Sequence, residues 1–300
     1  MTTAPSSRSD VTFESDGARC AAWLYRPHGG PTPAPCVVLA HGFSGLRGHR
    51  LAAFAERFVD AGLAALVFDY RHFGASEGEP RSLIDIDLQL ADWRAAVAYA
   101  RSLDGVDPGR VAIWGCSMGG GHVLKTAATT PDLAAVVALA PFGDGRLVAS
   151  RTPALAALRM IREGLRDRIG SWFGRPPHMI AVAGPPGSVA MLTSPDAEPG
   201  ILALASEDAP VDNRVAARIA LHIATYRPAS TAGEIAAPVL LQVCDDDVVA
   251  PPEPIVEAAK TMQRAELFRY PYGHFDVYLG EPFERVVVDQ VAFLRRHLLP

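Results

Sequence analysis

Short apolar segments alternate with stretches of helical periodicity along most of the 300-residue chain, and this alternation limits the folds open to it. Apolar runs bounded by turn signals predict strands, and apolar residues three or four positions apart predict amphipathic helices. The predicted strands lie at residues 11–13, 20–25, 36–40, 64–70, 111–114, 134–139, 239–243 and 266–270. The predicted helices include residues 50–61, a stretch that opens with a capping box at Ser82 and Asp85, and residues 287–298. Such alternation is typical of an α/β protein with a doubly wound, mostly parallel sheet.

One long interval interrupts the alternation. It has roughly ninety residues, which is too long for a plain connection between two strands. It contains an amphipathic stretch at residues 155–169, then Trp172 and Phe173, and a second stretch of helical periodicity at residues 211–223. The sequence therefore predicts a helical cap inserted between two strands. The expected division is a core of residues 11–140 and 237–300 and a cap of residues 141–236.

Composition narrows the classes of function. The net charge of -5 and pI of 6.0 predict no basic surface for nucleic acid or an anionic membrane. No apolar run reaches the roughly 18 residues of a transmembrane helix, and the polar first ten residues do not resemble a signal peptide. The four cysteines show no metal-ligand spacing, which predicts buried free thiols in a reducing compartment. We therefore expect a cytoplasmic protein that binds neither nucleic acid nor membrane, with a homodimer left open.

The segment Gly115-Cys-Ser-Met-Gly119 follows a predicted strand and opens an apparent helix. A G-x-S-x-G at such a junction predicts a sharp turn that exposes the serine hydroxyl, with glycines that leave room for the backbone. The helix N-terminus would favour developing negative charge. A phosphate-binding P-loop is excluded, because Leu124 and not glycine precedes Lys125-Thr126. Ser117 is therefore the candidate nucleophile, and a glycine-rich turn without chemistry is the alternative.

Three further polar segments follow predicted strands. His41-Gly-Phe43 comes directly after residues 36–40, Cys244-Asp-Asp-Asp247 ends another strand, and Tyr272-Gly-His274 lies between the last strand and the last helix. Parallel strands bring their carboxyl ends to one edge of the sheet, so these segments are expected near Ser117. Three adjacent aspartates leave the choice of carboxylate open, and a solvated acidic loop is an alternative.

Together with Asp69-Tyr-Arg-His-Phe-Gly-Ala-Ser-Glu-Gly78, these segments resemble the α/β-hydrolase superfamily over almost the whole chain, except the first ten residues and much of the insertion. The chain is most similar in pattern to bacterial esterases and acyl hydrolases near the dienelactone hydrolase and X-Pro dipeptidyl-peptidase-like (S15) families. The peptidase members carry large additional domains that this chain is too short to hold. A serine at the nucleophile position argues against dehalogenases, epoxide hydrolases and dienelactone hydrolase proper.

The resemblance implies a catalytic triad in the chain order Ser117, Asp247, His274. Asp247 is preferred to Asp245 because it comes three residues past the last apolar position of the strand, where the family keeps its acid. His274 would take the serine proton, and Asp247 would stabilise the resulting imidazolium.

The resemblance also implies an oxyanion hole made by the backbone N–H groups of Phe43 and Met118. His41 is then a structural residue of the loop. The cap would cover the triad, and Trp172 and Phe173 are expected to line an apolar pocket for the substrate.

These roles predict a serine hydrolase that cleaves an ester or related acyl bond of a small, apolar substrate through an acyl-enzyme. Neither a metal nor an organic cofactor is required. A lyase or acyltransferase with the same residues is the alternative, since a cap that excludes water favours another acceptor or an elimination. A non-catalytic binding protein is a third hypothesis. The sequence does not identify the substrate.

Overall fold

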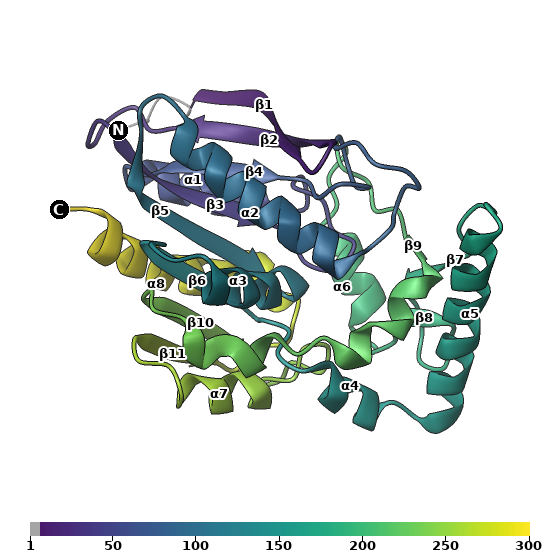
Figure 1. Cartoon of the computed structure of the whole chain (residues 1–300). Helices are drawn as coiled ribbons and strands as arrows, with labels where there is room; N and C mark the ends of the chain where they lie inside the picture. Colours follow the sequence, from purple (N-terminus) through teal and green to yellow (C-terminus); the bar gives the residue numbers. More distant parts are fainter. Residues whose placement is uncertain (1–6) are drawn as a thin grey trace.

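An eight-stranded sheet forms the centre of the computed structural model, which describes residues 7–300 (Figure 1). Its strands are β1 Ser7–Ser15, β2 Ala18–Arg26, β3 Ala34–Ala40, β4 Ala64–Phe68, β5 Val106–Cys116, β6 Ala135–Leu139, β10 Val239–Cys244 and β11 Ala265–Tyr270. They are ordered β1-β2-β4-β3-β5-β6-β10-β11 across the sheet. The six strands from β4 to β11 are parallel, and β1 and β2 pair antiparallel at one edge. The mostly parallel sheet expected from the sequence is confirmed.

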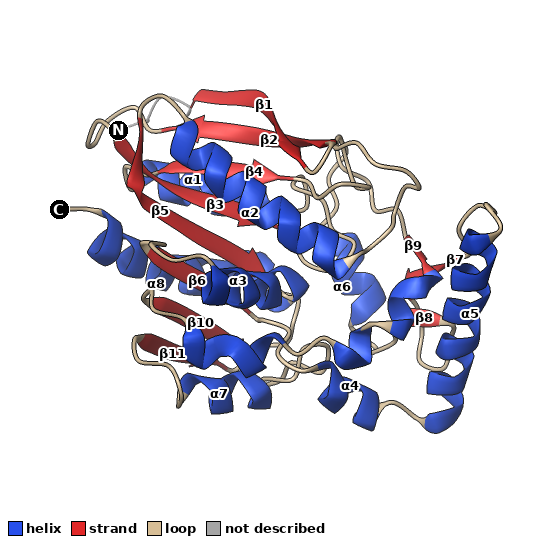
Figure 2. Ribbon diagram, viewed as in Figure 1, coloured by secondary structure: helices blue, strands red, loops and turns tan. Residues whose placement is uncertain are grey.

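Helices cover both faces of this sheet (Figure 2). They are α1 Leu51–Asp60, α2 Ile86–Ser102, α3 Met118–Thr129, α7 Glu253–Ala259 and α8 Gly280–Leu298. Helices α1 and α8 pack on one face, and α2, α3 and α7 pack on the other, each side with its own apolar core. Every residue of β3, β4, β6 and β10 is buried, which explains why these strands are apolar at every position except Gln242 in β10.

The chain between β6 and β10 folds over the carboxyl ends of the parallel strands, and we refer to residues 141–236 as the cap (Figure 1). Its elements are α4 Gly145–Arg151, α5 Ala154–Trp172, β7 Met179–Ala183, β8 Ala190–Leu192, α6 Ala197–Ala203, β9 Arg214–Ala216, and the 3₁₀ turns η1 Ala217–Leu221, η2 Ile223–Thr225 and η3 Pro228–Glu234. Strands β8, β7 and β9 form a separate three-stranded sheet.

The cap is therefore not purely helical, which corrects the expectation from periodicity. Residues 214–216 were expected within a helix but form β9, which pairs antiparallel with β7. This backbone pairing with a distant strand overrides the local helical spacing, and only short 3₁₀ turns follow it.

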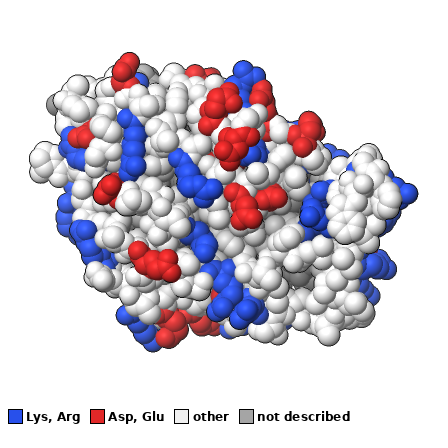
Figure 3. Space-filling view, in the orientation of Figure 1, with Lys and Arg blue, Asp and Glu red and all other residues white. Residues whose placement is uncertain are grey.

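Within residues 7–300, no helix combines the length and the apolar character needed to cross a bilayer. The face shown in Figure 3 carries acidic and basic side chains interspersed, without a continuous basic stripe.

Candidate active site

Ser117 lies at the junction of β5 and α3, in a strained backbone conformation. Its φ of 54° and ψ of -122° are unusual for a residue with a side chain, and they turn the hydroxyl away from the sheet. The glycines two residues before and two residues after the serine leave no room for a side chain. A Cβ on Gly115 would lie 2.2 Å from the carbonyl oxygen of Gly119, and a Cβ on Gly119 would lie 2.4 Å from the carbonyl oxygen of His41. The local geometry is a nucleophile elbow.

The preceding residue, Cys116, does not compete as a nucleophile. Its side chain is buried, and burial raises the pKa of the thiol to about 11. The thiol therefore stays protonated near neutral pH, and the protonated form is a poor nucleophile.

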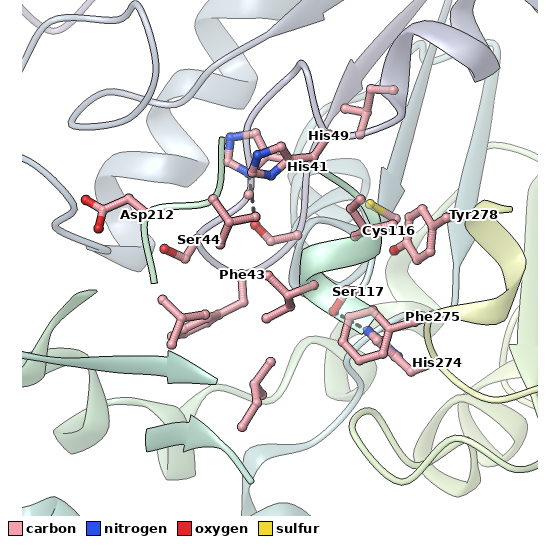
Figure 4. A pocket seen from close by; sticks show the side chains of 18 residues that line it. His41, Phe43, Ser44, His49, Cys116, Ser117, Asp212, His274, Phe275 and Tyr278 are labelled. Carbon is pink, nitrogen blue, oxygen red and sulfur yellow. Dashed lines mark hydrogen bonds between the residues drawn. The ribbon is translucent and has the colours of Figure 1, made fainter. Parts of the chain in front are cut away.

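The structure brings Ser117, His274 and Asp247 into one hydrogen-bonded chain (Figure 4 shows the serine and the histidine). The Oγ of Ser117 lies 3.0 Å from Nε2 of His274, and Nδ1 of His274 lies 2.5 Å from Oδ2 of Asp247. His274 and Asp247 are buried, at 2% and 4% exposure. This is the geometry needed for the histidine to accept the serine proton while the carboxylate fixes its tautomer.

The loop after β10 separates Asp247 from its two acidic neighbours. The Oδ1 of Asp247 accepts hydrogen bonds from the backbone N–H groups of Val249 and Ala250, at 2.8 and 2.7 Å, which leaves Oδ2 for His274. Asp245 is exposed and pairs with Arg269 at 2.8 Å, and Asp246 is also exposed. Of the three aspartates, the structure therefore places only Asp247 against the histidine.

The loop after β3 passes close above the serine. A Cβ on Gly42 would lie 2.8 Å from Cβ of Ser117, so the glycine permits this approach. The N–H of the next residue, Phe43, donates to no carbonyl within residues 7–300. The N–H of Met118 lies in the first turn of α3, where helix donors have no intrahelical acceptor. Two backbone donors therefore flank the serine, as an oxyanion hole requires.

Two buried histidines near the site are neutral and have structural partners. His41 bonds the carbonyl oxygen of Gly42 through Nδ1 at 2.9 Å, and burial lowers its pKa to about 3. His122 contacts the amide oxygen of Gln89 at 2.9 Å and the hydroxyl of Tyr226 at 2.6 Å, and burial lowers its pKa to about 3. Because Tyr226 belongs to the cap, His122 ties the cap to the core.

A cavity of about 60 Å³ lies above Ser117 and His274 (Figure 4). Loops of the core line one part of the cavity and include Phe43, Ser44 and Phe275, and the cap lines the rest. The cap side chains that line it are Val182, Leu192, Ile201, Leu204, Val211 and Asp212. Since five of these six are apolar, the cap forms a mainly apolar roof over a polar triad.

Trp172 and Phe173 do not line this cavity. They are 70% and 75% exposed at the end of α5, which packs on η1 through its polar side. The expectation that they contact substrate is therefore corrected. The lining residues on β7, β8 and α6 lie in short elements without helical periodicity, so no sequence pattern marked them.

Among residues 7–300, no group of three or more His, Cys, Asp and Glu side chains lies in an arrangement that could hold a metal ion.

Known proteins are similar to this chain over most of its length. A family model described as serine aminopeptidase, S33, matches residues 31–275. The quorum-quenching protein AidA of Acinetobacter baumannii (strain MDR-ZJ06) is 49% identical over 292 residues, covering 97% of this chain and 96% of that protein. The polyketide transferase ATR5 of Stachybotrys chlorohalonatus is 30% identical over 299 residues, covering 97% and 98%.

A solved structure has the same fold over nearly the whole described chain. The α/β-hydrolase GrgF from Penicillium superposes with a TM-score of 0.84 at 26% identity, covering 97% of this chain and 99% of that one. The narrower placement beside the dienelactone hydrolase and S15 families, expected from the motifs, finds no support in these matches.

Proposed function

The chain belongs to the serine aminopeptidase S33 family and is a serine hydrolase of the α/β-hydrolase fold, and from this premise we propose that Ser117, His274 and Asp247 carry out its chemistry. The observation that carries the proposal is the unbroken hydrogen-bond chain from the serine hydroxyl through the imidazole to the carboxylate. The reaction is acyl transfer to water, in two steps.

In the first step, the hydroxyl of Ser117 attacks the acyl carbon of the substrate while Nε2 of His274 takes the hydroxyl proton. The negative charge that develops on the carbonyl oxygen is stabilised by the N–H groups of Phe43 and Met118, each worth roughly 3 kcal/mol in such sites. The imidazolium then gives its proton to the leaving group. In the second step, His274 takes a proton from water while the water oxygen attacks the acyl carbon. The imidazolium then returns that proton to the Oγ of Ser117 as the bond between Oγ and the acyl carbon breaks, which releases the free acid.

The substrate we propose is a small molecule with an apolar acyl group. The apolar cap residues over the triad support this class, because they would desolvate an acyl chain. Since a 49% identical relative is named a quorum-quenching protein, an acylated signal molecule is the first candidate to test. The four cysteines are all free thiols, which supports a cytoplasmic location.

Two measurements test the proposal. A fluorophosphonate should label the wild-type protein at Ser117 and leave the Ser117→Ala variant unlabelled. The same substitution should lower turnover by on the order of 10⁴-fold or more on a panel of acyl lactones, acyl thioesters and p-nitrophenyl esters, because the triad acts as a unit. A folded variant that keeps a tenth of the wild-type rate would exclude Ser117 as the nucleophile.

Transfer to another acceptor is a second candidate, and a specific observation favours it. The cap residues that line the cavity over the triad are mainly apolar, so they would exclude water from the neighbourhood of a bound acyl group. A 30% identical relative is named a polyketide transferase. Product analysis with and without an added alcohol or thiol decides between the two: a free acid alone supports hydrolysis, and a new ester or thioester supports transfer.

A further inference from the structure

Helix α5 packs with its polar side inward and its apolar side outward. Its buried residues are Glu163, Gly164 and Asp167. Asp167 is fully buried and accepts from Nε of Arg218 at 2.7 Å and from the backbone N–H of His178 at 2.8 Å. Glu163 accepts from the His178 ring at 2.7 Å. A surface helix normally does the reverse, burying its apolar stripe.

The outward side of α5 is a continuous apolar stripe that no other element covers. It consists of Leu155, Leu158, Ile161, Leu165, Ile169, Trp172 and Phe173, which are 45% to 75% exposed. In Figure 3 the end of the molecule formed by α5 is white and bordered by blue. The inward ion pairs fix the rotation of the helix, so the stripe cannot turn into the core without breaking them.

The stripe has the size of one half of a protein interface. A large apolar or aromatic side chain presents on the order of 150–250 Å² when free, so these exposed fractions amount to roughly 800 Å². That exceeds the roughly 300–600 Å² patch of an ordinary monomer and equals the roughly 800 Å² that each partner contributes to a standard interface.

We propose that this stripe is the isologous interface of a homodimer, in which α5 of one copy packs against α5 of a second copy of this chain. Leu158, Leu165 and Trp172 are seven residues apart, and Ile161 follows the first of them by three. This spacing suits side chains that insert between those of a facing helix. A two-fold axis makes one such patch complementary to itself.

The charges beside the stripe suit a protein partner. Exposed Arg159, Arg162 and Arg166 border it, and arginine together with tryptophan is enriched at interfaces. An anionic bilayer would also attract these arginines. However, the area of the stripe matches one half of a standard protein interface, and its seven-residue spacing suits a facing helix, so the second copy is the occupant that the observations favour.

Sedimentation velocity and light scattering on the full chain test the dimer. The wild-type protein should be a dimer at micromolar concentration. The double variant Leu158→Glu/Leu165→Glu should be a folded monomer that still reacts with a fluorophosphonate, with a dissociation constant raised by about 100-fold or more, because four carboxylates would be desolvated without partners. The matched control is Val288→Glu on α8, also an exposed apolar residue, which should stay dimeric.

A cross-link provides an independent readout. Leu165 lies near the middle of the stripe, where the two copies of one residue meet across a two-fold axis. Since all four native cysteines are buried, Leu165→Cys should form an intermolecular disulfide under mild oxidation, whereas Val288→Cys should not. A monomeric wild type, or a dimer that resists the double substitution, would overturn the proposal. So would a monomer that floats with vesicles of phosphatidylcholine and phosphatidylglycerol.

Discussion

Three consecutive aspartates follow β10, and their surroundings set Asp247 apart from the other two. Asp247 has one carboxylate oxygen on two backbone N–H groups and the other on His274, so its position is fixed. Asp245 and Asp246 are in contact with solvent, and the Arg269 partner of Asp245 is more than half exposed. An exposed ion pair of this kind contributes little to stability.

We therefore expect Asp247→Asn to lower kcat/KM by on the order of 10⁴-fold, since the amide would hold the wrong tautomer of His274. Asp245→Asn and Asp246→Asn are the matched controls and should change kcat/KM by no more than about 3-fold, as surface substitutions do. Steady-state kinetics on the best ester of the panel measure all three. Similar losses at all three positions, or the greatest loss at Asp245, would contradict the assignment.

His122 predicts a pH dependence of stability. Burial lowers its pKa from 6.5 to about 3, so in this window the unfolded chain binds a proton that the folded chain does not. The free energy of unfolding must therefore fall as the pH drops below about 6.5, by about 1.4 kcal/mol per pH unit for this residue.

His122→Gln should reduce that slope by about 1.4 kcal/mol per pH unit between about pH 6 and pH 4, whatever its effect at neutral pH. Urea unfolding at a series of pH values gives the slope. His222→Gln, at an exposed position of the cap, is the control and should keep the wild-type slope. An unchanged slope in the His122 variant would show that this imidazole is protonated in the folded protein.

At the scale of elements, helix α6 fits against the histidine loop with no space to spare. A Cβ on Gly200 would lie 2.3 Å from Cγ of Phe275, the residue next to His274. Gly200→Ala must therefore displace either α6 or Phe275, and we expect kcat/KM to fall by roughly 10-fold. Leu202→Ala changes an exposed residue of the same helix and serves as the control.

Crystal structures of the two α6 variants would locate the shift. Movement of Phe275 or α6 in Gly200→Ala, with the fluorophosphonate still reaching Ser117, is the expected result. Wild-type kinetics for Gly200→Ala would show that the contact does not position the site.

The core elements were predictable because their patterns are local. The strand β3 is apolar at nearly every position because both of its faces are covered, and a G-x-S-x-G after such a strand has few other structural explanations. The start of α2 shows that such local patterns do not always identify the residue that caps a helix. Ser82 and Asp85 fit a capping box, but Asp85 is the N-cap, accepting from the N–H groups of Asp87 and Leu88, while Ser82 lies outside the helix at φ 57°.

The cap was less predictable because contacts distant in sequence determine it. The periodicity of α5 predicted a helix correctly, but not which side faces inward. That orientation depends on Arg218 and His178, which lie in other elements and satisfy Asp167 and Glu163. Strand β9 likewise exists through its pairing with β7. Amphipathic spacing alone therefore assigned the apolar side of α5 to the substrate, whereas the structure turns it to the surface.

For the whole molecule, the relation of cap to sheet determines which substrates fit. Ile201 and Leu204 lie on and after α6 and line the cavity over Ser117, whereas Trp172 and Phe173 are on the outer side of α5. All four side chains are apolar, but one pair lines the cavity and the other pair faces solvent. Substitutions in the two pairs therefore test which part of the cap contacts the acyl group.

Ile201→Ala and Leu204→Ala should shift the preference among acyl chain lengths towards bulkier groups, changing relative kcat/KM by roughly 10-fold, since each apolar contact is worth about 1–3 kcal/mol. Trp172→Ala and Phe173→Ala should leave the chain-length profile unchanged. Reactivity of Ser117 towards a small organophosphate should be close to wild type in all four variants, because none of these side chains belongs to the triad. A profile that responds to Trp172 or Phe173 and not to Ile201 or Leu204 would mean that the cap adopts another arrangement when substrate is bound.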